Sequence, residues 1–509
     1  MRQTVFGISL IMLLLNAAPT ASAQDACTGL TEARLPDVRI TRAVRVESGE
    51  EEGVSAAHCA VDGVIGREIG FEVLLPDDWN GRFAMGGGGG FVGSVQNMLR
   101  PSVDRGYATA GTDTGHQGPG TSAAWALNQP ERQVNFGHLA VHRTAEVAKA
   151  LIYAYYGTDP DYSYFMGCSR GGGQALMEAQ RYPDDFDGIV AGAPAFDWTG
   201  IGAEMVQNTQ KAYPSPSDTD RPIVTRDQLA YLEGAILEEC DGLDGVEDGV
   251  MEDPRACAFE IDALPRCPAS SDDGVCFTTR QVEAIREIYA PPTNDDGPLF
   301  VGQPFGGEGW EPGWIAWITG GVPNPEEAFG RDVPSLHYAF GVDMYRYLVF
   351  NDPEWDYSTY DFSSWENDVA YAAAFLNATD PDLRDFEERG GKLLLYHGWS
   401  DAALSALASI DFYEDVEARD GSVREYFRMY LMPGVLHCSG GSGPDQVDWL
   451  GIIRDWVESG EAPDRVVASK ADESGEVIRT RPLCPYPQRA AYTGSGSTDD
   501  AENFVCEAP

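Results

Sequence analysis

Of the 509 residues in this chain, 43% are hydrophobic and 11% aromatic, so we expect a sizeable packed core rather than disorder. Acidic residues number 81 against 35 basic ones, which gives a formal net charge of −46. A surface of this charge is repelled by nucleic acid and by anionic membrane surfaces, so both are excluded as partners.

The first residues predict a secretory signal peptide over 1–23. Arg2 supplies the positive charge, residues 5–15 form an apolar stretch, and Ala21-Ser22-Ala23 has the small side chains of a cleavage site. The apolar stretch is too short to cross a membrane comfortably, and no later segment is long enough. We therefore expect a mature chain that begins near Gln24 and is periplasmic or secreted.

The segments that follow alternate between strand and helix patterns. Between residues 162 and 193 a strand, a helix and a strand follow one another, which is a βαβ unit and implies a parallel sheet. Strands are predicted at 70–75, 82–85, 107–110, 162–166, 188–193, 392–396 and 425–432, and helices at 136–156, at 171–182 and within 443–459.

The pattern changes after Pro194. Residues 195–390 are rich in loops, prolines, cysteines and aromatic side chains, and sheet-like sequence returns only beyond them. The interpretation is an α/β fold whose sheet is interrupted by a cap domain. Its first part is predicted at 24–194, the cap at 195–390 and its second part at 391–509.

The ten cysteines predict five disulfides, because the count is even and the expected compartment is oxidising. The count alone does not fix how they pair. Short separations suggest Cys27–Cys59, Cys240–Cys257, Cys267–Cys276 and Cys484–Cys506, which leaves Cys168 and Cys438.

Gly167-Cys168-Ser169-Arg170-Gly171 matches the pattern G-x-S-x-G. A predicted strand precedes it and a glycine-rich helix start follows, and in this context a sharp turn lifts a serine hydroxyl above the sheet edge. The helix N-terminus below it favours developing negative charge. Since the pattern alone also occurs by chance, the context is what makes Ser169 the predicted nucleophile.

A serine nucleophile needs a base, and the base needs an acid that orients it. In α/β hydrolases the chain order is serine, acid, histidine. Asp401 and His437 each follow a predicted strand, in that order, where a parallel sheet presents its ligands. Of the other histidines after Ser169, His337 lies in the cap and His397 precedes the acid, so a structural role is the ordinary interpretation for both.

Cys168 immediately precedes the serine, and Cys438 immediately follows the histidine. Bonded cysteines have Cα atoms roughly 4.4–6.8 Å apart. A disulfide between these two would therefore hold Ser169 and His437 within side-chain reach. The alternative is that two unrelated buried cysteines lie beside two residues of interest.

These residues resemble the tannase and feruloyl esterase family, in which such a cysteine pair ties the nucleophile to the histidine. The similarity covers nearly the whole mature chain, and it is especially close to the family's terephthalate-monoester hydrolases, cysteine placement included. The motifs that carry it are Gly167–Gly172, Phe186–Pro194, Tyr396–Asp401, His437–Gly441 and Arg481–Pro487.

The resemblance implies an α/β-hydrolase fold with a large inserted cap and hydrolysis of small aromatic esters. Feruloyl or other hydroxycinnamoyl esters and galloyl esters are the expected substrates, and mono(2-hydroxyethyl) terephthalate is an alternative. An inactive secreted binding protein and a serine peptidase are the rival classes. The resemblance also implies an oxyanion hole formed by the backbone N–H groups of Gly90 and Arg170, and such preorganised donors stabilise a tetrahedral oxyanion.

Asp241, Asp244 and Asp248 lie in an acidic, glycine-rich loop. Clustered carboxylates beside glycines suit a hard cation, although in so acidic a chain such a loop is by itself more often solvated surface. The resemblance implies a structural Ca²⁺ held by these aspartates and by the carbonyls of Val246 and Val250.

Aromatic residues of the cap are candidates for the substrate pocket, and the alternative is that they form the cap core. The arginine with which a terephthalate-monoester hydrolase would bind a free carboxylate has no clean counterpart, because Arg331 and Arg346 are displaced. The candidates are Trp310, Trp314, Trp317 and the segment Tyr338–Phe350.

Overall fold

The structure is a computed structural model that describes residues 23–50, 52–267 and 276–508. All of the predicted signal peptide except Ala23 lies outside the described residues. Among those described, no helix has the length and apolar character needed to cross a membrane.

A nine-stranded sheet organises the protein, with the strand order β1-β2-β3-β5-β4-β6-β7-β10-β11. The pairs from β1 to β5 are antiparallel and the pairs from β5 through β4 to β11 are parallel. The strands are β1 (Val38–Val46), β2 (His58–Ile65), β3 (Ile69–Pro76), β4 (Arg82–Gly86), β5 (Ala108–Thr112), β6 (Tyr162–Cys168), β7 (Gly188–Gly192), β10 (Lys392–Gly398) and β11 (Phe427–Met432).

Helices cover both faces of the parallel part of the sheet. Leu393 and Leu395 pack into a core cluster with residues of α3 (Ala140–Tyr156), α4 (Arg170–Arg181) and α11 (Ala406–Arg419). Leu394, between them, packs on the opposite face with residues of α12 (Trp449–Ser459). Successive side chains of a strand point to opposite faces, so the near-continuous apolar run of β10 is what burial on both faces requires.

Each strand predicted from the sequence corresponds to a strand of this sheet. The predicted helix 136–156 differs at its start, because Asn135–Leu139 form a π-helical turn between α2 (Pro130–Val134) and α3. The hydrophobic pattern of the sequence did not predict β1 and β2, which lie at the antiparallel end of the sheet. In β1 a single residue, Ala43, is buried, so the strand carries little apolar alternation.

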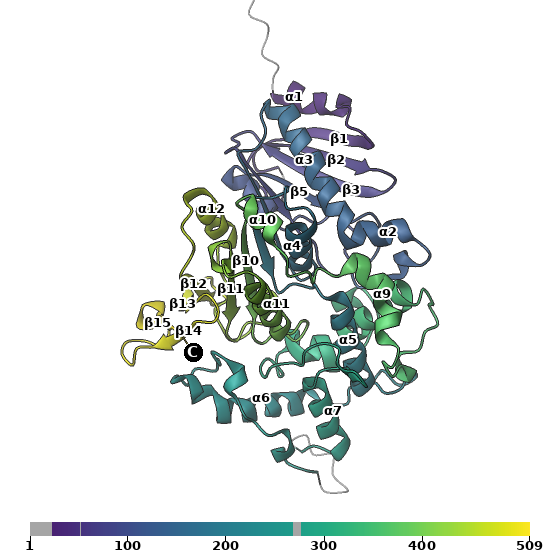
Figure 1. The fold of residues 1–509 in the computed structure, drawn as a ribbon, viewed down its shortest axis with the longest axis vertical. Helices are drawn as coiled ribbons and strands as arrows, with labels where there is room; N and C mark the ends of the chain where they lie inside the picture. Colours follow the sequence, from purple (N-terminus) through teal and green to yellow (C-terminus); the bar gives the residue numbers. More distant parts are fainter. Residues whose placement is uncertain (1–22, 51, 268–275, 509) are drawn as a thin grey trace, which may run out of the picture.

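Between β7 and β10 the chain leaves the sheet and returns to pair beside the strand it left. In Figure 1, α6 and α7 of this segment, which contains the residues predicted as the cap, lie at the lower end of the molecule, α10 lies beside α4 and β10, and β1–β3 lie at the upper end. It contains α5 (Trp198–Ala212), α6 (Arg226–Cys240), α7 (Thr279–Tyr289), β8 (Thr293–Asn294), β9 (Gly297–Pro298), α8 (Pro325–Phe329), α9 (Trp365–Leu376) and α10 (Arg384–Glu388).

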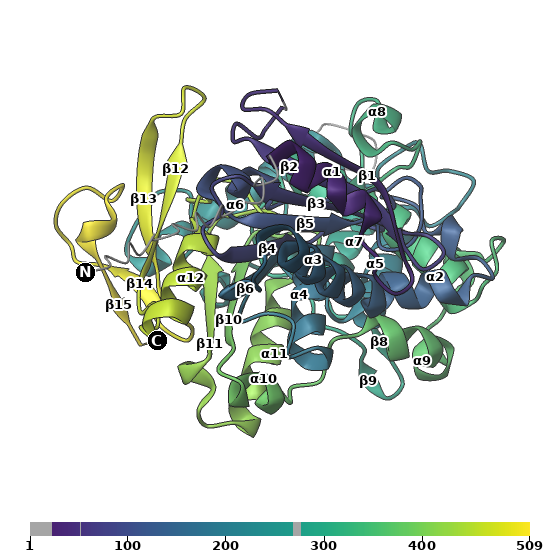
Figure 2. The same ribbon diagram turned by 90° about the horizontal axis from the view of Figure 1, so that it is seen from above.

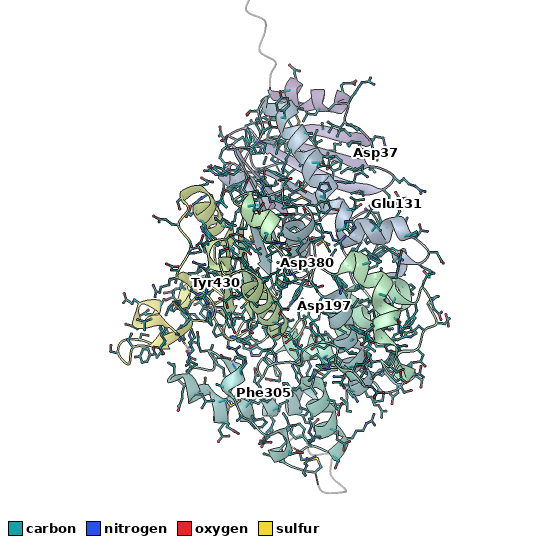
Figure 3. The ribbon with its side chains drawn as sticks, viewed as in Figure 1. Asp37, Glu131, Asp197, Phe305, Asp380 and Tyr430 are labelled. Atoms are coloured by element: carbon teal, nitrogen blue, oxygen red, sulfur yellow. A yellow bond between two sulfur atoms is a disulfide. The ribbon has the colours of Figure 1, made fainter. Side chains whose placement is uncertain are left out.

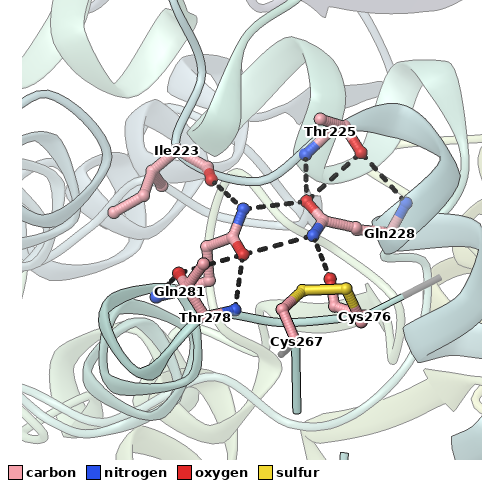
Figure 4. The surroundings of a disulfide bond; sticks show 7 residues. All are labelled: Ile223, Thr225, Gln228, Cys267, Cys276, Thr278 and Gln281. Atoms are coloured by element: carbon pink, nitrogen blue, oxygen red, sulfur yellow. Dashed lines mark hydrogen bonds between the residues drawn. A yellow bond between two sulfur atoms is a disulfide. The ribbon is translucent and has the colours of Figure 1, made fainter. Parts of the chain in front are cut away.

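Two capping boxes join α6 to α7 within the cap (Figure 4). Gln228 closes the box at the start of α6, and its Nε2 also donates to the carbonyl oxygen of Cys276 (2.6 Å) and to Oε1 of Gln281 (3.2 Å). Gln281 closes the box of α7, and Cys276 is bonded to Cys267. The disulfide and the paired glutamines therefore fix the two helix N-termini together.

The C-terminal residues form two hairpins outside the main sheet, β12 (Val466–Ala471) with β13 (Val477–Leu483) and β14 (Arg489–Tyr492) with β15 (Phe504–Glu507). Figure 2 shows β12 and β13 projecting at one side of the molecule. Ala490 and Phe504 pack against Val246, so the C-terminal region supports the loop predicted to bind calcium. The first helix, α1 (Ala23–Gly29), packs on β1 at the other end.

All ten cysteines are paired, in the five combinations suggested by the sequence. Four of the disulfides close loops of 9 to 32 residues, and Cys168–Cys438 joins residues 270 apart.

Candidate active site

Ser169 sits in a sharp turn between β6 and α4. Its backbone has φ 62° and ψ −123°, a conformation that a residue with a side chain rarely adopts. The turn is held by hydrogen bonds from Ser169 N to the carbonyl of Gly192 (3.0 Å) and from Ala195 N to the carbonyl of Ser169 (2.9 Å). Gly167 is required because a Cβ there would lie 2.4 Å from the carbonyl carbon of Gly171. The sequence thus forms the strained elbow that exposes a nucleophile.

Asp401 and His437 are hydrogen-bonded to each other after the ends of β10 and β11. His437 Nδ1 lies 2.8 Å from Asp401 Oδ2, and Asp401 Oδ1 accepts the backbone N–H groups of Ala403 and Leu404. Burial would raise the pKa of the Asp401 carboxyl, but the imidazoles of His437 and His397 outweigh it and hold that pKa below its usual value. The carboxylate therefore stays ionised and fixes the imidazole with Nε2 facing away from it.

The two other histidines considered as bases lie around the same acid. His397 Nε2 is 3.2 Å from Asp401 Oδ2 and 3.0 Å from the carbonyl of Leu404, while its Nδ1 is 2.8 Å from Ser409 Oγ. His337 is fully buried, contacts the carbonyl of Ala403, and has a pKa that burial lowers to about 4. Both act as supports of the acid's loop.

The Cys168–Cys438 disulfide sets the serine beside the histidine. Its Cα atoms are 6.0 Å apart, and Ser169 and His437 line one cavity together with both half-cystines. Within the described part of the chain the hydrogen bonds do not include one between Ser169 and His437. Catalytic hydrogen bonds are often long in a substrate-free site and tighten when substrate binds.

The glycine run after β4 leaves one N–H group free at this cavity. The N–H groups of Gly87, Gly88 and Gly89 donate to Met166 O, Gln174 Oε1 and Gln96 Oε1. The next residue after Gly90, Phe91, donates to Gly120 O (2.6 Å). Among the described contacts the N–H of Gly90 has no acceptor, and Gly90 lines the cavity at φ 53°. A Cβ at Gly90 would lie 2.4 Å from Gly120 O, so the turn needs glycine.

Arg170 opens α4 directly after the nucleophile, so its N–H is one of the unpaired donors of a helix N-terminus. Its side chain is 1% exposed, and its guanidinium lies 4.5 Å from the ring centre of Phe136 and 5.4 Å from that of Trp198. Nη2 donates to the carbonyls of Phe136 and Gly137, which belong to the π-helical turn. Burial lowers the pKa of this guanidinium to about 9. The arginine therefore locks the first turn of α4 against the π-helical turn.

The cavity has a volume of about 330 Å³ and mostly apolar walls. The sequence predicted three of its apolar residues, Trp317, Phe340 and Met344, but not the side chains of α5 or Leu404, which the tertiary fold brings to the nucleophile. The helical spacing of Trp198, Ile201 and Met205 is the signal that could have identified the side chains of α5. The apolar side chains are Trp198, Ile201, Met205, Trp317, Phe340, Met344 and Leu404.

The tryptophans predicted for the pocket occupy three different environments. Trp317 lines the cavity, with its ring edge-on to His437 at 4.9 Å. Trp314 is 1% exposed and packs into the core of the cap, while Trp310 is 40% exposed and borders a separate, small cavity. From the segment Tyr338–Phe350, Phe340 and Met344 line the main cavity.

The loop predicted to bind calcium is ordered by its own aspartates. Asp241 accepts the N–H groups of Gly249 and Val250, and Asp244 accepts those of Val246 and Glu252, at 3.0 to 3.1 Å. Asp248 pairs with Arg481 and Arg479. Among the described residues, the three side chains whose ligand atoms all lie within 4.8 Å of one another are His142, Glu178 and Asp185, rather than these aspartates.

The positions of serine, acid and histidine define the class of the protein. Each follows the carboxyl end of a strand in the parallel part of the sheet, after β6, β10 and β11, in the chain order that α/β hydrolases share, and a solved structure of this fold confirms the predicted α/β-hydrolase fold.

A family model described as tannase and feruloyl esterase matches residues 55–507. Mono(2-hydroxyethyl) terephthalate hydrolase of Piscinibacter sakaiensis is 33% identical in an alignment over 515 residues, gaps included. The alignment covers 89% of this chain and 85% of that protein. A probable feruloyl esterase of Arthroderma benhamiae is 34% identical over 457 residues, 85% of this chain and 81% of that protein. The crystal structure of feruloyl esterase B from Aspergillus oryzae is 28% identical, with a TM-score of 0.84 over 96% of this chain and 100% of that one. The chain belongs to the tannase and feruloyl esterase family, and it is a carboxylic ester hydrolase.

Proposed function

We propose that the protein hydrolyses esters of aromatic acids through a Ser169–His437–Asp401 triad. The observation that carries the proposal is the His437–Asp401 hydrogen bond at the cavity that Ser169 also lines. The family relatives, named for feruloyl esters and for a terephthalate monoester, support aromatic esters as the substrate class.

In this mechanism Ser169 Oγ attacks the ester carbonyl while His437 Nε2 takes the hydroxyl proton. Asp401 stabilises the resulting imidazolium through the hydrogen bond to Nδ1. The N–H groups of Gly90 and Arg170 stabilise the oxyanion of the tetrahedral intermediate. His437 then protonates the leaving alcohol, and a water molecule, deprotonated by His437, releases the acid from the acyl-enzyme.

Replacing Ser169 with alanine is expected to lower kcat for an aromatic methyl ester by about 10⁴–10⁶-fold, because the nucleophile is lost while binding remains. Ser439→Ala, an exposed serine next to Cys438, is the matched control and should keep its activity. Hydrolysis is followed by liquid chromatography of the released acid, and thermal unfolding of both variants checks folding. A fully active Ser169→Ala variant would end the proposal.

We further propose that the loop of Asp241, Asp244 and Asp248 holds a structural Ca²⁺, with the carbonyls of Val246 and Val250. Carboxylate and carbonyl oxygens are the ligands that Ca²⁺ prefers. Burial and then the charges of Asp248 and Asp241 raise the pKa of the Asp244 carboxyl, and a divalent cation would offset this crowding of negative charge.

Removal of Ca²⁺ by EDTA is therefore expected to lower the Tm by several degrees, and added Ca²⁺, but not Mg²⁺, should restore it. Asp241→Asn should have a low Tm that no longer responds to either reagent. Elemental analysis of the native protein should give one calcium per chain. No retained calcium together with an unchanged Tm would contradict the site.

We also propose that the mature chain acts in the periplasm or outside the cell. Five disulfides, with no free cysteine among the described residues, are typical of an oxidising compartment. The sequence 1–23 has the features of a cleaved signal peptide.

A further inference from the structure

We infer that His142, Glu178 and Asp185 bind one Zn²⁺ ion, at a site that shares no residue with the active site or with the loop proposed to hold Ca²⁺. His142 lies in α3, Glu178 in α4, and Asp185 in the connection from α4 to β7. One ligand atom of each side chain lies within 4.8 Å of the ligand atoms of the other two. Ligand atoms that bind one Zn²⁺ at about 2.0–2.2 Å lie roughly 3.3–3.6 Å apart in a tetrahedral site, so small side-chain rotations bring all three onto one ion.

Glu178 provides the observation that points to a cation. It is 1% exposed, and among the described residues no N–H or O–H group donates to either of its carboxylate oxygens. Burial and then the charge of Asp185 raise the pKa of the Glu178 carboxyl well above its usual value, because the two carboxyl groups lie close together in a buried place. A buried carboxylate without a partner is strongly unfavourable, and a cation between the two groups would pair with both.

His142 supplies the nitrogen ligand that makes the set suit Zn²⁺. Its Nδ1 lies 2.6 Å from Asp185 Oδ2, and its ring stacks on Tyr182 with 4.0 Å between the ring centres and 6° between the planes. Its Nε2 lies 3.5 Å from Oε2 of Glu146, as in zinc sites where a bound histidine donates its other N–H to a carboxylate. One imidazole and two carboxylates suit Zn²⁺, whereas Ca²⁺ and Mg²⁺ prefer oxygen ligands alone.

The cationic side chains nearby do not pair with the two carboxylates of the site. Lys149 Nζ donates to the backbone carbonyl of Asp185, and Arg389 pairs with Asp184 (3.5 Å) and Asp187 (3.3 Å). Within the described residues, neither forms an ion pair with the carboxylate of Glu178 or Asp185. The negative charge of the site is therefore left for a bound cation to balance.

The three ligands differ in their access to solvent. The side chain of His142 is 24% exposed and that of Asp185 10%, whereas Glu178 is buried. An ion can therefore be captured first by the exposed histidine and keep one water molecule as its fourth ligand. Since α4 begins directly after Ser169 and Glu178 lies in its last turn, the ion would fasten this helix to α3. We expect it to stabilise the fold and to take no part in ester hydrolysis.

The test is a titration with ZnCl₂ under conditions that keep the calcium loop filled. The protein is stripped with EDTA, returned to buffer with saturating Ca²⁺, and titrated by isothermal titration calorimetry. We expect one saturable Zn²⁺ per chain and, at a free Zn²⁺ concentration about 100-fold above Kd, a Tm raised by roughly 2–3 °C. Only weak, unsaturable binding would overturn the inference, and it would leave a proton shared by Glu178 and Asp185 as the occupant.

Variants assign the bound ion to these residues. Glu178→Gln keeps the shape of the side chain and should weaken Zn²⁺ binding by at least about 100-fold. Without metal its Tm should equal or exceed that of the unmodified protein, because an unpaired buried carboxylate is removed. His142→Ala, at a partly exposed position, should lose binding to the same extent and serves if Glu178→Gln does not fold.

Asp184→Asn is the matched control, since Asp184 precedes Asp185 but its side chain is 96% exposed. It should bind Zn²⁺ like the unmodified protein. Unchanged binding in folded Glu178→Gln or His142→Ala, or an equal loss in Asp184→Asn, would overturn the inference. Binding and Tm are measured without a substrate, so the outcome does not depend on the proposed ester hydrolysis.

Discussion

Asp401→Asn should lower kcat by about 10⁴-fold with little change in KM. This is the largest effect that we expect from replacing a residue that does not itself react with the substrate. Asparagine can donate its amide N–H to Nδ1, which stabilises the tautomer with the proton on Nε2. That nitrogen can then no longer accept the proton of Ser169. The low pKa of the Asp401 carboxyl means that the unmodified acid keeps its charge well into the acidic range.

The control for this variant is Asp464→Asn, which changes an exposed carboxylate that pairs with Arg428 and not with a triad residue. It should match the unmodified protein in kcat. His397→Gln, which removes the second imidazole beside Asp401, should have an effect intermediate between the two. Retention of more than a tenth of the activity by folded Asp401→Asn would show that a different acid orients His437.

Removal of the Cys168–Cys438 disulfide is expected to lower kcat/KM by about 100-fold or more, because small displacements of reacting groups are costly. Closure of a loop of 270 residues contributes roughly 5–6 kcal/mol in the chain-entropy model, an upper estimate. The Cys168→Ala/Cys438→Ala variant should therefore also unfold at lower urea concentration. Activity is measured at a temperature where circular dichroism shows it folded.

Cys27–Cys59 provides the matched comparison, since it closes a loop of 32 residues beside β1 and β2, away from the cavity. Its removal should cost up to about 4 kcal/mol of stability but leave kcat/KM nearly unchanged. Equal losses of activity in both double variants would show that the Cys168–Cys438 bond stabilises the fold without positioning the site.

The elbow around Ser169 could be predicted because its signal is local. A strand, a glycine-flanked serine and a helix start are adjacent in the sequence, and the steric need for Gly167 is met within a few residues. The other triad members could be predicted from chain order, because parallel strands end at one edge of a sheet. Cys168 and Cys438 added a long-range constraint, because a disulfide between them holds Ser169 close to His437.

The substrate cavity could be predicted only in part. Trp314 and Trp317 are three residues apart on one π-helical segment, yet one is core and the other lines the cavity. Which face of that segment meets the nucleophile depends on how the segment packs against α5. The sequence did not predict β1 either, because this edge strand has one buried residue and therefore no alternation of apolar and polar side chains. Figure 3 labels Tyr430, in β11, and Asp197, which caps α5, among the side chains.

Stoichiometric labelling with a phosphonate shows whether Ser169 forms the covalent intermediate. The protein is treated with p-nitrophenyl phenylphosphonate, residual ester hydrolysis is recorded over time, and the labelled peptide is identified by mass spectrometry. We expect one phosphonyl group per chain, on Ser169, in proportion to the activity lost. Complete inactivation with the label on another residue, or full labelling of Ser169 with activity retained, would contradict it.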